Sequence, residues 1–244
     1  DNLYSCFVQD EITLSEDLWY LTVGSKFERN DYTGFECQPS IRLLWTPDQK
    51  HSLWTSVSRA VRTPARCESD VSTIRPSPGF VPASDPPVPI FPIIQPNPNP
   101  LSEELIAYEA GIRGQPTDRF SWDLAVFFND YQRLSVPLPG VAYPTMWGLF
   151  LPLNESNVLS GHTYGFEVAN TYQLTARWRL QAAYTFLVMD LRPVAGTSLA
   201  EDMEGSSPRN LFYLQSSWDL GRRWELDLAR ISHNCDRKGP FPLA

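Results

Sequence analysis

Apolar and polar residues alternate along many short segments of this chain, and the apolar positions are rich in aromatic side chains. Segment 120–128 shows the pattern most clearly, since Phe120, Trp122, Leu124, Val126 and Phe128 all fall on one side. A repeat of two residues indicates a β-strand with two unlike faces. In this segment one of the two faces is strongly apolar.

The same pattern predicts about ten strands, each close to the roughly 9–11 residues that a tilted strand needs to cross a membrane. Some faces can be assigned individually: Tyr108, Ala110 and Ile112 alternate with Glu109, Gly111 and Arg113. The fold class expected is therefore all-β and antiparallel. The predicted strands are residues 4–14, 18–28, 37–46, 51–61, 104–114, 119–131, 161–173, 177–190, 209–219 and 223–232.

The connections between these strands alternate strictly between short and long. Tight turns are expected at 15–17, 47–50, 115–118, 174–176 and 220–222, and longer connections at 29–36, 62–103, 132–160 and 191–208. An up-and-down transmembrane β-barrel has this asymmetry, with short turns on one side of the membrane and long extracellular loops on the other. Aromatic residues near strand ends, such as Trp19 and Trp45, suit the girdles of such a barrel.

A proline cluster marks the longest connection, 62–103. Proline lacks the N–H that a sheet ladder requires, so this segment is predicted to be an extended, stiffened loop. An interpretation as a proline-rich signalling ligand rests on composition alone and is the weaker one. The ten prolines are Pro76, Pro78, Pro82, Pro86, Pro87, Pro89, Pro92, Pro96, Pro98 and Pro100.

Composition and charge narrow the possible partners. The mean hydropathy of −0.28 is that of a soluble protein, but barrel strands balance an apolar face with a polar one, so a membrane location stays open. A net charge of −8 disfavours nucleic acid as a partner. The chain has no starting Met and no signal peptide, which indicates a piece of something longer.

Four widely spaced cysteines leave two interpretations open. Their spacing disfavours a zinc site. Cys37 and Cys67 could form a loop disulfide in an oxidising compartment, or all four could be isolated thiols. The other two cysteines are Cys6 and Cys235.

Several phrases, in order along residues 5–230, resemble the TonB-dependent outer-membrane receptors. Ser58-Arg-Ala-Val-Arg-Thr-Pro64 is similar to a strand end of that family, and residues 99–113 (NPLSEELIAYEAGIR) resemble its "NPxLxPExxxxYExGxR" box. Two further phrases, Phe127-Phe-Asn-Asp-Tyr131 and Gly161-His-Thr-Tyr-Gly-Phe-Glu167, resemble other family boxes. Each phrase alone matches the family with low specificity, but the occurrence of all of them in the family's order is specific.

The resemblance implies a barrel of about 22 strands with an N-terminal plug and a TonB box that couples to the inner membrane. Residues 1–232 would form a partial barrel of roughly ten strands from its C-terminal part, with the plug domain absent. The tail, 233–244, departs from the family because it lacks a closing amphipathic strand with a terminal aromatic residue. The implied location is the outer membrane of a Gram-negative bacterium.

No catalytic pattern is found, so we expect no enzymatic activity, no cofactor and no metal site. The better ligand candidates lie on the long-loop side, where aromatic rings could stack on a planar ligand and a cation could attract an anionic iron complex; they are Arg75, Phe80, Phe91, Tyr143, Trp147 and Phe150, with Arg62 as a further cation. The predicted lumen-facing residues, which more often form wall networks or contact the plug, are Arg42, Glu109, Arg113, Glu167 and Arg179.

The function expected is TonB-coupled uptake of a ferric siderophore or a similar large, scarce solute, with outer-membrane lipid and the TonB system as partners. TonB would act through the plug. A passive porin-like or adhesin barrel is one alternative, and a soluble secreted β-sandwich binding protein is another. The sandwich would pair its apolar faces in a dry core.

Overall fold

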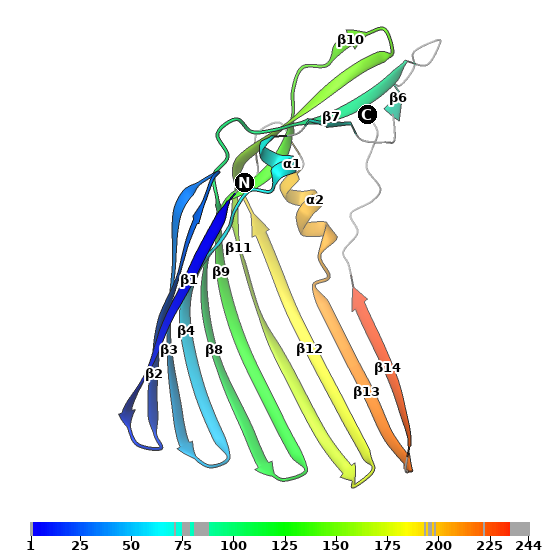
Figure 1. The fold of residues 1–244 in the computed structure, drawn as a ribbon. Helices are drawn as coiled ribbons and strands as arrows, with labels where there is room; N and C mark the ends of the chain where they lie inside the picture. The colour runs from blue at the N-terminus through cyan, green and yellow to red at the C-terminus, as the bar shows by residue number, and fades with distance from the viewer. Residues whose placement is uncertain are drawn as a thin grey trace.

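Ten long antiparallel strands, hydrogen-bonded in chain order, form the body of the protein (Figure 1). The computed structural model describes residues 2–70, 72–74, 79–80, 88–192, 194, 197, 199–221 and 223–234. The predicted antiparallel up-and-down architecture of a partial barrel is confirmed. The ten strands are β1 (Leu3–Ser15), β2 (Trp19–Asn30), β3 (Gly34–Asp48), β4 (His51–Arg62), β8 (Glu103–Thr117), β9 (Phe120–Pro139), β11 (Gly148–Thr175), β12 (Trp178–Leu191), β13 (Asn210–Gly221) and β14 (Trp224–Asn234).

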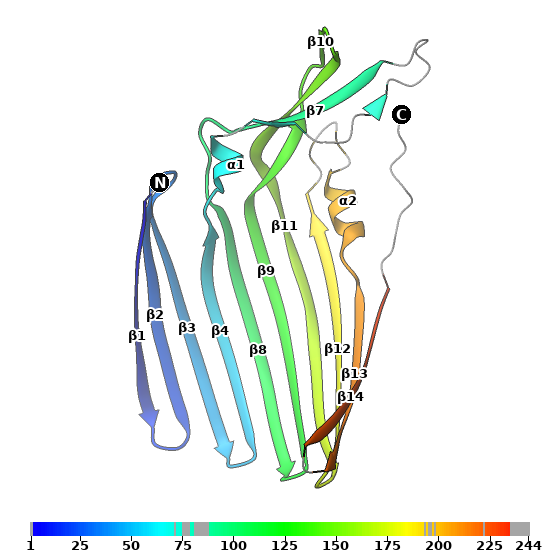
Figure 2. The same cartoon turned by 45° about the vertical axis from the view of Figure 1, so that its right-hand side comes forward.

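Smaller elements gather at one end of this sheet, and short turns lie at the other (Figures 1 and 2). The predicted connection 62–103 contains most of them, and the connection 191–208 contains a helix. The asymmetry of turns and long connections is therefore present in space. The smaller elements are α1 (Arg66–Ser69), β5 (Thr73–Ile74), β6 (Gly79–Phe80), β7 (Pro89–Gln95), β10 (Tyr143–Thr145) and α2 (Leu199–Ser206).

The register gives the sheet two unlike faces. Val57, Tyr108, Phe128 and Tyr164 are paired in sequence across β4, β8, β9 and β11, so their side chains share one face. All four are exposed, Tyr108 at 47% and Phe128 at 42%. The strands do not bury this apolar face against any other described part of the chain, and we call it the outer face.

Buried side chains concentrate at the end that carries the smaller elements. Val136 of β9, Leu159 of β11, Leu191 of β12 and Ala200 of α2 form one cluster, in which Leu159 is fully buried. The two outermost strands, β1 and β14, are exposed along their whole length. The sheet is thus an open wall with one small packed region rather than a body with a central core.

The predicted loop at 132–160 is instead mostly strand, because β9 continues to Pro139 and β11 begins at Gly148. Register shifts on either side of Leu159 break the repeat of two residues, so the alternation of apolar and polar residues is lost there. The side chain of Asn157 donates to the carbonyls of Arg133 (2.9 Å) and Leu101 (3.1 Å). These bonds satisfy backbone groups near the irregularity.

The prediction that the proline segment joins no ladder is wrong for β7. This strand pairs in parallel with residues 149–154 of β11. On its other side it pairs with β5 through residues 93–94 and with β6 through residues 89–90. Pro92 falls in the gap between those two pairings, and Pro89 is the first residue of the strand, positions where a missing N–H costs little.

The cysteine alternatives are settled for Cys37, which is a free thiol, as is Cys6. The Sγ of Cys37 lies 3.4 Å from the Oγ of Ser25 on the neighbouring strand. Of the two alternatives left open, the Cys37–Cys67 disulfide is therefore not formed. The side chain of Cys67, like Cys235 and the rest of the tail from 235 onward, lies outside the described residues.

Replacement of Leu159 tests the packed cluster. We expect Leu159→Ala to lower the free energy of unfolding by about 2–5 kcal/mol, because a fully buried leucine leaves a cavity. Guanidinium unfolding followed by tryptophan fluorescence measures this. The control, Leu220→Ala, removes an exposed side chain at the turn end and should change stability by less than about 0.5 kcal/mol. Equal effects of the two changes would contradict the assignment.

Candidate functional site

An aromatic cluster lies beyond the barrel strands, at the end away from the short turns. The ring of Phe91 on β7 meets that of Phe150 on β11 edge to face, with centroids 5.6 Å apart. Tyr143 on β10 meets the same Phe150 ring in a similar way at 6.0 Å. Edge-to-face pairs at this separation are attractive beyond their buried area. The three strands therefore present a joined aromatic surface, which we call the aromatic arm (Phe91, Tyr143 and Phe150).

A tight turn positions the arm. The hydroxyl of Thr145 accepts the N–H of Trp147 (3.2 Å) and donates to the carbonyl of Gly148 (2.9 Å). Gly148 has φ +136°, and a Cβ there would lie 2.3 Å from the carbonyl oxygen of Pro89. Only glycine allows β7 to approach β11 this closely.

The structure brings together only some of the ligand-binding residues predicted from the sequence. Phe91, Tyr143 and Phe150 come together, and Trp147 stands at the tip of the turn between β10 and β11 with 69% of its surface exposed. Phe80 lies on β6 beside β7, but its side chain is outside the described part of the structure, as is all of Arg75.

Arg62 forms ion pairs within the protein, so its positive charge is less available to bind an anionic ligand. Its guanidinium contacts Glu103 at 2.6 Å and Glu68 at 3.0 Å. Glu68 also accepts the N–H of Ala65 at 2.8 Å and thereby holds the first turn of α1. These contacts link the start of the long 62–103 connection to β4 and β8.

A second charged group lies where β4 leaves β3. The last pair between these strands is Ser40 with Ser58. Beyond it, the guanidinium of Arg59 donates to the carbonyl of Cys37 and to Glu104. Glu104 also pairs with Arg133 of β9. Arg59 thus replaces missing ladder bonds between the two strands.

These charge pairs explain two of the family-like phrases. Both arginines of the Ser58–Pro64 phrase pair with Glu103 or Glu104, which belong to the phrase at 99–113. This pairing cannot be recognised from the two phrases alone. The signal was present as two arginines in one phrase and two glutamates in the next, but only the β4–β8 register places them together.

A hydrogen bond also joins the 62–103 connection to the turn between β2 and β3. The phenol of Tyr32, in the turn between β2 and β3, donates to the Asp70 carboxylate at 2.9 Å. Desolvation, followed by this bond and the negative charge of Asp70, raises the pKa of the Tyr32 phenol. Within the 62–103 connection itself, the backbone N–H of Asn97 donates to the carbonyl of Glu68 at 2.8 Å.

The register places the five predicted lumen residues on a single face, opposite to the outer face. Ser56 pairs with both Arg42 and Glu109, and Arg113 pairs with Asp123. Glu167 and Arg179 join the same face through the β9–β11 and β11–β12 registers.

Most of these five side chains have partners on the wall itself. Arg113 forms an ion pair with Asp123, Glu109 accepts the hydroxyl of Ser56 at 3.1 Å, and Arg42 lies 4.8 Å from the ring centre of Trp54. The arrangement is a network along a wall, which is the commoner of the roles expected for such residues from the sequence.

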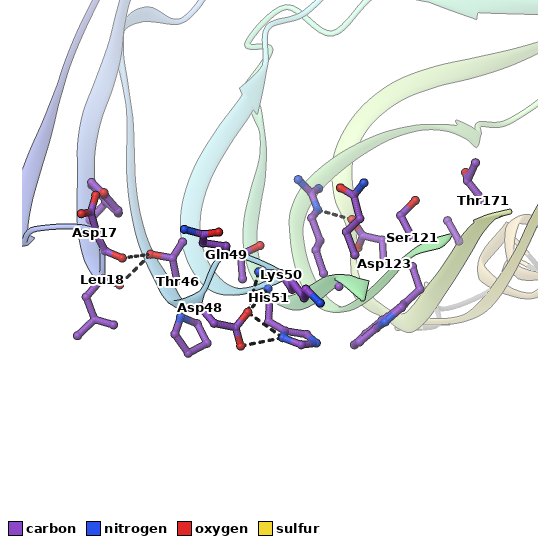
Figure 3. A pocket seen from close by; sticks show the side chains of 18 of the residues that line it. Asp17, Leu18, Thr46, Asp48, Gln49, Lys50, His51, Ser121, Asp123 and Thr171 are labelled. Carbon is purple, nitrogen blue, oxygen red and sulfur yellow. Dashed lines mark hydrogen bonds and ion pairs between the residues drawn. The ribbon is translucent and has the colours of Figure 1, made fainter. Parts of the chain in front are cut away.

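Near the short turns this face encloses an open pocket of about 1030 Å³ (Figure 3). Residues from six strands and their turns line it, including Asp17, Lys50, Asp123 and Thr171. Because side chains from so many strands converge on it, this face is the concave one. The imidazole of His51 and two backbone N–H groups bind the Asp48 carboxylate at 2.7–2.9 Å and fix the β3–β4 turn at its rim.

The described residues contain no cluster of three or more histidine, cysteine or carboxylate side chains that could hold a metal ion. None of their helices is long and apolar enough to cross a membrane.

A curved, open antiparallel wall with a polar concave face and an apolar outer face defines a segment of an outer-membrane type of β-barrel. The family description "TonB dependent receptor-like, beta-barrel" matches residues 1–239, so the chain belongs to this family. No curated protein matches the sequence.

Several solved structures of similar fold are described as siderophore receptors. The siderophore receptor PirA of Pseudomonas aeruginosa is 18% identical with a TM-score of 0.70, and the match covers 95% of this chain and 40% of that one. A mutant of the ferric enterobactin receptor of the same organism is also 18% identical, with a TM-score of 0.68 and coverage of 95% and 32%. The alcaligin outer-membrane receptor of Bordetella pertussis is 14% identical, with a TM-score of 0.59 and coverage of 96% and 38%. The chain thus spans 32–40% of the length of these receptors.

Removal of the Glu104 charge tests the junction of β3, β4 and β9. We expect Glu104→Gln to lower the free energy of unfolding by about 1–3 kcal/mol, because two guanidinium groups lose their shared partner. Denaturant unfolding gives the value. Glu16→Gln, in the exposed β1–β2 turn, serves as the control and should have almost no effect. A Glu104→Gln protein as stable as its parent would refute the role of this pair.

Proposed function

We propose that this chain is part of the wall and outer arm of a receptor that imports a ferric siderophore, or a similar large and scarce solute, across the outer membrane of a Gram-negative bacterium. The observation that carries the proposal is the division of one sheet into an aromatic outer face and a polar concave face, with the aromatic arm at the long-loop end. Membership of the TonB-dependent receptor family supports it.

The two faces suit two different surroundings. The outer face bears Tyr108, Phe128 and Tyr164 in an unbroken row, which lipid would solvate better than water. The concave face bears ion pairs and hydroxyl–carboxylate bonds that suit a water-containing lumen. A soluble β-sandwich is disfavoured, because its strands would bury the aromatic row in a dry core.

The aromatic arm is the proposed first contact for the solute. Trp147 and the arm rings lie at the end where long connections gather, on the side that would face the outside of the cell. Aromatic faces and edges bind flat or ring-containing ligands with little loss of conformational freedom. The arm needs no catalytic group for this, and the role proposed is binding and transport rather than catalysis.

The concave pocket is the proposed seat of a plug. Its lining carries charges of both signs, Asp17, Asp123 and Lys50 among them, so it suits a polar protein surface better than an apolar ligand. Energy from TonB would reach the solute through that plug. A passive porin-like or adhesin barrel is the rival proposal, and it needs neither a plug nor an aromatic arm.

The receptor that contains this chain is the protein to test. We expect Trp147→Ala and Phe150→Leu each to raise the Kd for a ferric catecholate siderophore about two- to tenfold, since each removes about 0.5–1.5 kcal/mol of ring contact. Fluorescence quenching on titration gives the Kd, and growth under iron limitation gives the uptake.

Val141→Ala is the matched control, because Val141 is exposed in the connection between β9 and β10 but is not aromatic. It should leave the Kd unchanged. An unaltered Kd in both aromatic variants would reject the arm as the binding surface, whereas growth without any dependence on TonB would favour the passive barrel.

A further inference from the structure

The outer face carries a depression that its large side chains do not fill. It is an open groove of about 430 Å³ whose lining is almost wholly apolar. Its floor lies at Thr55 of β4 and Ala110 of β8, which are directly paired. Leu43 and Val126 flank these two small residues in the same row.

The neighbouring row of side chains explains why a groove results. The row nearer the short turns carries Trp45, Leu53, Ile112 and Leu124. All four line the groove together with Thr55 and Ala110. Two small side chains beside this row of large ones leave a hollow in the surface.

The floor of the groove offers no free hydrogen-bond donor. The hydroxyl of Thr55 donates to the backbone carbonyl of Glu109 at 3.0 Å, so its one proton is engaged within the sheet. Ala110 has only a methyl group. An occupant therefore meets an almost wholly apolar surface.

Two tryptophans border the groove at its end nearest the turns. Trp19 and Trp45 stack with ring centroids 5.4 Å apart and nearly parallel planes. Tryptophan prefers the level of the lipid headgroups. The Trp19–Trp45 pair therefore marks the membrane boundary on the short-turn side, and the groove extends from that boundary into the hydrocarbon layer.

We propose that this groove binds one acyl chain of a phospholipid from the leaflet on the short-turn side. The proposal rests on the membrane location given under the proposed function. The groove is continuous with the lipid-facing surface, no described segment of the chain covers it, and it begins at the depth where a phospholipid headgroup would lie. Dispersion contacts with the walls, rather than a hydrophobic transfer, would hold the chain, because the lipid is already in an apolar phase.

Ala110→Phe tests the proposal by filling the groove with a ring. The full receptor is purified from the membrane in mild detergent, and native mass spectrometry counts the phospholipids that remain bound. We expect the parent to keep a phospholipid through detergent exchange and Ala110→Phe to lose it. Siderophore binding should stay unchanged, because the arm is remote from the groove.

Ala182→Phe is the matched control. Ala182 lies on the outer face of β12, paired with Leu214 of β13, and it does not line the groove. This variant should keep the phospholipid. A second measurement, the motionally restricted fraction of a spin-labelled phospholipid in vesicles, should fall only for Ala110→Phe.

Three outcomes would overturn the groove assignment. They are equal phospholipid retention in the parent and in Ala110→Phe, equal loss in both phenylalanine variants, and retention of lipopolysaccharide instead of phospholipid. Failure of the proposed function gives a different result. A parent that keeps its phospholipid but binds no ferric siderophore would contradict the proposed function and leave the groove assignment valid. A chain that is soluble without detergent would contradict the groove assignment and the proposed function together.

Discussion

Backbone hydrogen bonding across an apolar layer is the constraint on which the rest of this structure depends. A strand in such surroundings must pair along both edges, because no water replaces a lost partner. Regular antiparallel registers meet this requirement over most of the ten strands. Where β4 separates from β3, the Arg59 side chain supplies the missing donor to the Cys37 carbonyl. The charge of Arg59 is in turn neutralised by Glu104, so the junction combines a backbone role with an ion pair.

The repeat of two residues then allows the two faces to serve different surroundings. Charged and hydroxyl-bearing side chains on the concave face find partners on adjacent strands, as Arg113 does with Asp123. The outer face is constrained only to be apolar, which leaves the sizes of its side chains free. That freedom produces both the aromatic rows and the groove above Thr55 and Ala110.

Beyond the regular part of the wall, the pairing of strands changes. Register shifts around Leu159 turn β9 and β11 into a projecting hairpin, and Gly148 lets a proline-containing strand join it in parallel. Side chains pack here against α2 in a cluster that resembles the core of a soluble domain. The proposed binding surface is thus built on a projecting part of the protein that the wall supports.

The sequence alone determined the strands, their two faces and the side on which the long connections gather, because alternation and turn spacing are local properties of the chain. It also placed Phe91, Tyr143 and Phe150 among the candidates. Only the tertiary structure decided that these three rings meet, that β7 enters the sheet despite Pro92, and that Arg59 and Arg62 bind Glu104 and Glu103. The physical reason is that each depends on a pairing between residues tens of positions apart, or on a register shift that erases the local pattern.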